Sequence, residues 1–301
     1  MAKKIIIGVI SFLITACLIG LIVTGAKIGW GPFAFIKYSK EPTLLSTTEY
    51  KYSTEETWLK NGEKSIYGTL YKADTQSEKQ PIAILSHGYN GSSEYNKYIA
   101  KSLAMSGISV YAYDFCGGGT KSKSDGKSVD MSIITEKSDL NAVIDQVKAW
   151  DWVDQNNIFL IGESQGGCVS ALTAAERTDI NSIVLYFPAF SIIEGANQQF
   201  KSADDIPDTS KAFMGMTIGK KYYEDILGID VYKEISKFEN PVLLMHGTAD
   251  KTVDCSYSEK ANQVYRNSKL IKFENAGHGF NSKDSEKAAK YAYDFINKNL
   301  K

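Results

Sequence analysis

The residues best suited to chemistry are a serine, an aspartate and a histidine that each follow an apolar, strand-like run. Ser164 stands in GESQGG (residues 162–167), Asp250 ends HGTAD, and His278 lies in AGHGF. A serine hydroxyl is a weak nucleophile at neutral pH, so it needs a base that is itself oriented by an acid. The order serine, aspartate, histidine therefore predicts nucleophilic catalysis with Ser164 as nucleophile, His278 as base and Asp250 as acid.

Two alternatives stay open on the residues alone. Asp254 is a second candidate acid, although it is also placed to cap a helix that begins near Ser256. The pattern GxSxG also fits an ordinary strand-to-helix turn with a capping serine. The apolar run before Ser164 and the helical stretch after it favour a nucleophile elbow, in which a strained turn projects the hydroxyl above the sheet.

A tetrahedral intermediate carries an oxyanion that needs two preorganised N–H donors. One predicted donor is the backbone amide of Gln165, directly after the nucleophile. The other is the amide of Tyr89 in the glycine-rich stretch HGYNGS (residues 87–92). A plain glycine-rich turn would explain those glycines too, but the place of the stretch after the first parallel strand favours the functional interpretation. His87 and His246 are predicted to be structural or to support this loop.

The elements that must position these residues alternate between strand and helix, which predicts an α/β fold with a mostly parallel central sheet and helices on both faces. An Asn61-Gly62 turn between two β-rich runs predicts an antiparallel hairpin at its start. Ligands of such sheets bind at the carboxyl ends of the strands, where the candidate residues lie. The strands are expected at residues 81–86, 108–114, 158–162, 183–187, 242–246 and 270–273, and the helices at 95–105, 133–150, 166–177, 256–266 and 283–299.

Residues 191–240 interrupt the alternation. A structureless loop of that length is uncommon in a compact domain, so a small inserted lid is expected over one end of the sheet. The apolar side chains of Phe213, Met214 and Met216 are candidates to contact an apolar acyl or aryl group there.

The N-terminus departs from the rest of the composition. Residues 1–4 form a short basic segment. Residues 5–25 carry no charge, and a helix of that length can cross the hydrocarbon core of a membrane. A single-pass signal anchor with the catalytic domain outside the cytoplasm is the favoured interpretation. A lipoprotein anchored at Cys17, or a cleaved or buried segment, are the alternatives. Residues 26–53 read as a juxtamembrane linker, and residues 54–301 as the folded domain.

The remaining composition excludes several classes of function. A net charge of -1 with 34 basic and 35 acidic residues gives no electrostatic footprint for nucleic acid. The four cysteines form no CxxC pair and suggest neither a metal site nor a disulfide framework. Neither a metal nor a cofactor is expected.

With these motifs in order, the sequence resembles the α/β-hydrolase superfamily, and within it the cinnamoyl and feruloyl esterase-like group of bacterial serine esterases. The resemblance begins near Ile66 and rests on SHGYNGS, YDFCGGGTKSKSDGKS, GESQGG, PVLLMHGTAD and AGHGF. It implies an α/β-hydrolase fold, a Ser164, Asp250 and His278 triad, oxyanion amides from Tyr89 and Gln165, and a lid formed by residues 191–240.

The leading hypothesis is a carboxylic ester hydrolase that forms an acyl-enzyme on Ser164 and takes a small-molecule ester as substrate. A monoacylglycerol lipase-like or a serine aminopeptidase-like hydrolase is the alternative within the enzyme class. A catalytically silent, membrane-tethered binding module is the hypothesis from another class, and the presence of all three triad candidates argues against it.

Overall fold

The structure is a computed structural model that describes residues 41–301, and its first regular element is a β-hairpin. Strands β1 (Tyr52–Asn61) and β2 (Lys64–Ala73) pair antiparallel along their full length. Gly62 adopts a φ of +59° in the turn between them, a conformation that glycine adopts without steric cost. The hairpin predicted around Asn61-Gly62 is confirmed.

Residues 5–25, the predicted membrane anchor, lie outside the described residues, as does Cys17. Within residues 41–301, no helix is both long and apolar enough to cross a membrane. These described residues cluster as one unit from Glu41 to Lys301.

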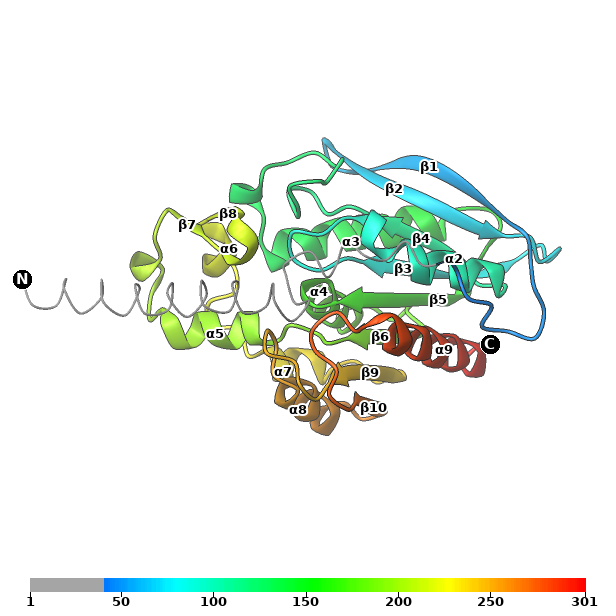
Figure 1. Cartoon of the computed structure of the whole chain (residues 1–301). Helices are drawn as coiled ribbons and strands as arrows, with labels where there is room; N and C mark the ends of the chain where they lie inside the picture. The colour runs from blue at the N-terminus through cyan, green and yellow to red at the C-terminus, as the bar shows by residue number, and fades with distance from the viewer. Residues whose placement is uncertain (1–40) are drawn as a thin grey trace, which may run out of the picture. The chain divides into compact units, whose positions relative to one another are not determined.

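The central sheet in this part of the chain has eight strands in the order β1-β2-β4-β3-β5-β6-β9-β10 (Figure 1). The hairpin joins the sheet through an antiparallel β2–β4 pairing, and every pairing from β4 to β10 is parallel. The mostly parallel sheet with an antiparallel start is as predicted. The parallel strands are β3 (Gln80–Ser86), β4 (Ser109–Tyr113), β5 (Val153–Glu163), β6 (Ser182–Tyr186), β9 (Val242–Gly247) and β10 (Ser268–Phe273).

Helices cover both faces of this sheet, which makes two apolar layers. Successive side chains of a strand point to opposite faces, so Leu160 of β5 joins one layer and its neighbour Ile161 joins the other. The layer around Leu160 is covered by α3 (Ile133–Lys148), α4 (Gln165–Ala174) and α8 (Ser256–Val264). The layer around Ile161 is covered by α2 (Lys97–Met105) and α9 (Ser282–Lys298).

The segment between β6 and β9 contains short elements instead of one long loop. In Figure 1 its yellow-green part, which includes β7, β8 and α6, lies at the end of the sheet where α4 begins. Its last helix, α7, instead packs into the layer of α4 and α8. The elements are α5 (Ser191–Gln199), η4 (Ala203–Asp205), β7 (Thr209–Lys211), η5 (Phe213–Gly215), β8 (Thr217–Gly219), α6 (Lys221–Glu224) and α7 (Val231–Ile235).

Two further 3-10 turns, η2 (Ser93–Asn96) and η3 (Ser128–Asp130), lie in the loops after β3 and β4. They precede α2 and α3 respectively. The second of these turns contacts β8 and α6 of the inserted segment, so it joins that segment to the sheet domain.

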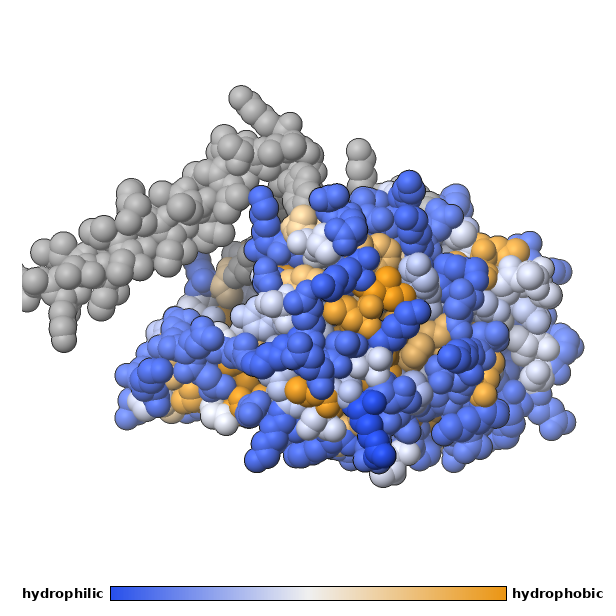
Figure 2. Space-filling model, turned by 90° about the horizontal axis from the view of Figure 1, so that it is seen from below, coloured by the Kyte–Doolittle hydropathy of each residue, from blue (hydrophilic) through white to orange (hydrophobic). Residues whose placement is uncertain are grey.

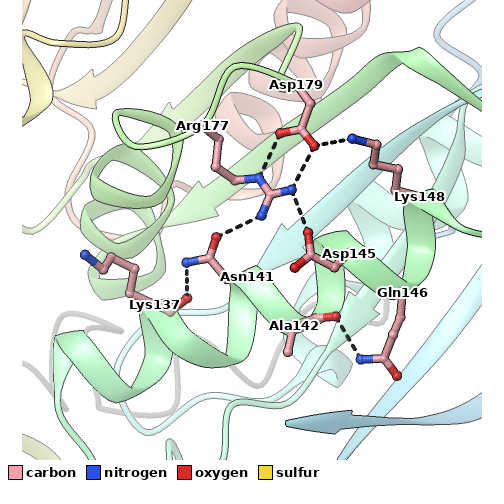
Figure 3. A network of polar contacts seen from close by, with 8 residues as sticks. All are labelled: Lys137, Asn141, Ala142, Asp145, Gln146, Lys148, Arg177 and Asp179. Atoms are coloured by element: carbon pink, nitrogen blue, oxygen red, sulfur yellow. Dashed lines mark hydrogen bonds and ion pairs between the residues drawn. The ribbon is translucent and has the colours of Figure 1, made fainter.

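A charged network holds the C-terminal ends of α3 and α4 together (Figure 3). The Arg177 guanidinium donates two hydrogen bonds to Asp179, each of 2.8 Å, and one of 2.7 Å to Asp145. It also donates to Asn141 at 3.0 Å, and Lys148 reaches Asp179 at 2.7 Å. Because the Arg177 hydrogen bonds and the nearby Lys148 favour the charged carboxylate more than partial burial opposes it, the pKa of Asp179 is lowered.

The edge strand β10 lies on the side of the molecule that Figure 2 shows. Hydrophilic side chains cover most of that face, and hydrophobic ones gather in small patches between them. β10 carries exposed Lys269 and Lys272, and Lys272 pairs with Glu259 of α8. Charged edge residues of this kind discourage pairing with a strand of another chain.

Candidate active site

Ser164 lies in a strained turn between β5 and α4. Its backbone has a φ of +51° and a ψ of -117°, a combination that residues with a side chain rarely adopt. A Cβ added at Gly162 would lie 2.4 Å from the Gly166 carbonyl oxygen, and one at Gly166 would lie 2.3 Å from the His87 carbonyl oxygen. Both glycines are therefore required by the close approach of backbone around the turn.

The structure brings Ser164, His278 and Asp250 into one chain of hydrogen bonds. The Ser164 Oγ lies 3.0 Å from the His278 Nε2, and the His278 Nδ1 lies 2.7 Å from the Asp250 Oδ2. An ionised carboxylate only accepts, so Nδ1 carries the proton and Nε2 is left to accept from the serine hydroxyl. The ring of Phe187 packs against the His278 ring with centroids 4.6 Å apart. The arrangement can remove a proton from Ser164.

Asp250 is fixed by several donors besides His278. Its Oδ1 accepts the backbone amides of Thr252 and Val253 at 2.8 and 2.9 Å. Burial opposes ionisation of this carboxyl, but hydrogen bonds from His246 and His278 outweigh burial and lower its pKa. Asp250 is therefore held as a carboxylate that orients the His278 ring.

Asp254, the alternative acid, has a local partner instead. Its Oδ1 accepts the backbone amide of Ser256 at 2.9 Å, at the start of α8. Hydrogen bonding to the side chain of Ser256, and then to its backbone amide, lowers the pKa of the Asp254 carboxyl. The geometry therefore favours Asp250 over Asp254 as the partner of the histidine.

His246 lies behind Asp250 and is fully buried. Its Nε2 lies 2.9 Å from the Val253 carbonyl oxygen and 3.2 Å from the Asp250 Oδ2, and its Nδ1 lies 2.6 Å from the Ser258 Oγ. A carbonyl oxygen requires a donor, so Nε2 carries a proton that is shared with the carboxylate. The ring supports the loop that holds Asp250.

The loop after β3 approaches Ser164 closely. A Cβ added at Gly88 would lie 3.1 Å from the Ser164 Cβ and 3.8 Å from its Oγ. Among residues 41–301, the backbone amides of Tyr89 and Gln165 donate no hydrogen bond. An oxyanion needs N–H donors that are free to bind it, so both amides stay candidates for that role.

His87 and Asp114 hold the loops on either side of this position. The His87 Nε2 accepts the Phe115 amide at 3.0 Å, and its Nδ1 lies 2.8 Å from the Gly88 carbonyl oxygen. Burial lowers the pKa of His87, which keeps the ring neutral. Asp114 accepts the backbone amide of Ser93 at 2.7 Å, as well as one from the loop after β4. Both side chains are therefore structural supports of the site.

Sequence reasoning missed a buried network beneath the nucleophile elbow. The Gln165 Nε2 donates to the Glu136 Oε2 at 2.8 Å, and the Gln165 Oε1 accepts from the Tyr222 hydroxyl at 2.6 Å. Burial raises the pKa of Glu136 well above its ordinary value, although the hydrogen bond from Gln165 opposes this. No local pattern marks these residues, because they come from three separate segments of the chain.

Two of the candidate lid residues, Met214 and Met216, differ in burial. Met216 is buried in a small apolar cluster with Met131, Ile218 and Tyr222, against which the Tyr89 ring packs. Met214 is 37% exposed. Phe213 begins the short turn η5. Met216 therefore belongs to a cluster that contacts Tyr89 of the loop after β3.

Residues 41–301 contain no group of three or more histidine, cysteine, aspartate or glutamate side chains that could hold a metal ion. Cys116, Cys168 and Cys255 are buried thiols, and burial raises the pKa of each.

Comparison with known proteins identifies the superfamily. The profile of a family described as serine aminopeptidase, S33, matches residues 77–225. The solved structure of Est1E from Butyrivibrio proteoclasticus with bound ferulic acid superposes with a TM-score of 0.74 at 27% identity. The alignment covers 81% of this chain and 98% of Est1E. The chain belongs to the α/β-hydrolase superfamily.

Two curated proteins whose names place them among α/β-hydrolases also match the chain. This α/β-hydrolase is 24% identical to the AB hydrolase superfamily protein YisY of Bacillus subtilis, over 76% of this chain and 96% of YisY. It is 28% identical over 148 residues to the alpha/beta hydrolase domain-containing protein 17C of Mus musculus. That match spans 49% of this chain and only 38% of the mouse protein, so the two share part of a domain.

Proposed function

We propose that this α/β-hydrolase is a serine hydrolase of carboxylic esters that works through an acyl-enzyme on Ser164. The observation that carries the proposal is the hydrogen-bonded chain from the Ser164 hydroxyl through His278 to Asp250, with distances of 3.0 and 2.7 Å. The strained backbone of Ser164 adds support, since strain of this kind is retained at functional sites.

The first half of the reaction forms the acyl-enzyme. The His278 Nε2 takes the proton of Ser164 as the Oγ attacks the ester carbonyl carbon. Negative charge then develops on the carbonyl oxygen, where the amides of Tyr89 and Gln165 donate to it. The tetrahedral intermediate collapses, the C–O bond to the alcohol breaks, and His278 returns the proton to the departing alcohol.

The second half releases the acid. A water molecule gives a proton to the His278 Nε2 and attacks the acyl carbon, and the bond to the Ser164 Oγ breaks as the oxygen regains its proton. Asp250 keeps the ring in the tautomer that accepts at Nε2 and stabilises the imidazolium in both halves. The reaction needs no redox partner.

The substrate class rests on the apolar cluster next to the oxyanion loop. Met216 and Tyr222 are buried in this cluster and the partly buried Tyr89 ring packs against it, so the loop after β3 rests on aromatic and thioether side chains, surroundings that suit an apolar acyl or aryl group nearby. The 27% identity to Est1E, whose structure contains ferulic acid, supports the ester class as well. A serine aminopeptidase-like activity, suggested by the family that matches residues 77–225, is the second candidate. A monoacylglycerol lipase-like activity remains a third.

A hydrolysis panel tests the proposal. The full chain is assayed with p-nitrophenyl acetate and butyrate, methyl ferulate, a monoacylglycerol and an aminoacyl naphthylamide, beside Ser164→Ala. We expect ester turnover by the wild type and its loss in Ser164→Ala. Turnover of the naphthylamide alone would favour the aminopeptidase, and ester turnover that survives Ser164→Ala would refute the mechanism. A folded wild type that hydrolyses none of them would indicate a silent binding module.

A further inference from the structure

Tyr222 of the inserted segment contacts both Tyr89 and Gln165, the residues whose backbone amides are the proposed oxyanion donors. Its hydroxyl donates to the Gln165 Oε1 at 2.6 Å, and its ring meets the Tyr89 ring edge-on with centroids 6.1 Å apart. We propose that Tyr222 is a positioning residue of the oxyanion hole, through which the inserted segment fixes the two amide donors. This inference rests on the proposed function and assigns a role to a residue outside the triad.

The inserted segment is anchored independently of Gln165. The Ser128 Oγ donates to the Thr217 carbonyl oxygen, and the Ser132 Oγ donates to Asp225, each at 2.6 Å. A Cβ added at Gly219 would lie 2.1 Å from the Val129 carbonyl oxygen, so the two backbones are in close contact there. These contacts flank Tyr222 on both sides and hold its position whether or not Gln165 is engaged.

Tyr222 supplies the hydrogen-bond donor for the oxygen of the Gln165 carboxamide. Its nitrogen is directed to Glu136 by the 2.8 Å hydrogen bond, which leaves the oxygen facing the tyrosine hydroxyl. Gln165 is 1% exposed, so no bulk water replaces a lost partner. A buried carbonyl oxygen without a donor is unfavourable, and the side chain is expected to move in response.

Movement of that side chain affects the amide at the nucleophile. Gln165 is the first residue of α4, and it follows Ser164, whose φ of +51° already strains the turn. The peptide that carries the donor N–H therefore relies on contacts made by the Gln165 side chain. Because an oxyanion exists only in the transition state and the intermediates, a displaced donor lowers kcat and leaves KM unchanged.

The test compares Tyr222→Phe with Tyr223→Phe in the full chain. The first removes the hydroxyl and keeps the ring that packs on Tyr89. The second makes the same change one residue further on in α6, where the hydroxyl takes part in no hydrogen bond among the described residues. With p-nitrophenyl acetate, Tyr222→Phe should lower kcat about tenfold with KM within about twofold, and Tyr223→Phe should change neither.

A transition-state analogue separates positioning from stability. The inhibition constant of phenyl trifluoromethyl ketone, which forms a tetrahedral adduct on the serine, should rise about tenfold in Tyr222→Phe. This readout comes from folded molecules, so a change in stability does not move it. An unchanged inhibition constant and kcat in a folded Tyr222→Phe would overturn the inference while leaving the proposed function intact, whereas an inactive wild type would overturn both.

A double-mutant cycle tests whether the effect passes through Gln165. Gln165→Met keeps the backbone amide and nearly the same side-chain volume, but it removes the acceptor for the Tyr222 hydroxyl. If Tyr222 acts through that side chain, adding Tyr222→Phe to Gln165→Met should lower kcat no further. Two independent losses that multiply in the double variant would contradict the positioning role.

Discussion

Helices α3 and α4 lie side by side, and their two ends hold polar networks of opposite character. At the N-terminal ends, Glu136 is buried with its Oε1 lacking a hydrogen-bond partner among the described residues, and its pKa is raised. At the C-terminal ends, Arg177 and Lys148 surround Asp179, whose pKa is lowered. Burial opposes ionisation of the Glu136 carboxyl in the first network, whereas the second network is built around an ionised Asp179.

The difference separates a functional end of the molecule from a stabilising one. The strained Ser164 and the buried Glu136, whose Oε1 has no hydrogen-bond partner among the described residues, occur together at the end where the proposed triad lies. Natural proteins break rules of packing and pairing mainly at functional sites, and they compensate elsewhere. The network of Arg177 is well placed to supply such compensation. Substitutions at the two ends should therefore affect different properties.

The largest effect is expected for Asp250→Asn at the functional end. Loss of the carboxylate removes the charge that selects the His278 tautomer, so kcat should fall by about 10³ to 10⁴-fold. Asp254→Asn is the matched control, because that carboxylate pairs with Ser256, and its kcat should stay within about twofold of wild type. Ester hydrolysis at saturating substrate measures both, and a larger loss in Asp254→Asn would reverse the assignment of the acid.

The stabilising end is tested by Arg177→Ala. The change removes four hydrogen bonds and leaves Asp145 and Asp179 without their shared cation, so the free energy of unfolding in urea should fall by about 2–3 kcal/mol. The kcat of the folded variant should match wild type. Arg266, with 77% side-chain exposure and a single ion pair, is the control, and Arg266→Ala should cost less than about 0.5 kcal/mol. Equal losses of unfolding free energy in Arg177→Ala and Arg266→Ala would contradict the stabilising role of the Arg177 network.

Neutral substitutions of the two carboxyls should shift the pH dependence of stability in opposite directions. The pKa of Asp179 is lowered by folding, so its contribution is present above the unfolded value of about 3.9 and is lost as the pH falls below it. Asp179→Asn should cost about 1 kcal/mol at pH 7, a figure that allows for solvent screening of a partly exposed group, and nothing at strongly acid pH.

Glu136→Gln should do the reverse. Folding raises the pKa of Glu136 above its value of about 4.3 in the unfolded chain. The contribution of this side chain to stability is therefore greatest below that pH and is lost as the pH rises. The variant should gain stability relative to wild type between about pH 5 and pH 8. Urea unfolding across this range measures the difference, and a gain toward acid pH would contradict the assigned environment.

The sequence predicted the elements well because each has a local signal. The Asn61-Gly62 turn marks the hairpin, and the expected helix at 283–299 is found at Ser282–Lys298. The sites of Ser164, Asp250 and His278 at strand ends also follow from the strand pattern. Whether these three side chains meet depends on the order of the strands in the sheet. The resemblance to a known fold implied that order, but the local periodicity of the sequence does not contain it.

The rest of the site could not be predicted because it depends on contacts between distant segments. Glu136 is one of several polar residues along α3, and nothing near it in sequence indicates that it is fully buried. Tyr222 lies in a segment expected only as a lid, and its partner Gln165 lies 57 positions earlier. Even α7, inside the same expected lid, packs on the sheet layer because its apolar face meets α4 and α8.

The central claim is that the Ser164 hydroxyl is a nucleophile activated by His278. The most direct measurement is mass spectrometry of the full chain after incubation with a fluorophosphonate, in which the serine oxygen attacks phosphorus and fluoride leaves. We predict one adduct that maps to Ser164, is absent in Ser164→Ala and forms much more slowly in Asp250→Asn. An unlabelled wild type, or an adduct on another serine in a chain that hydrolyses esters, would contradict the account.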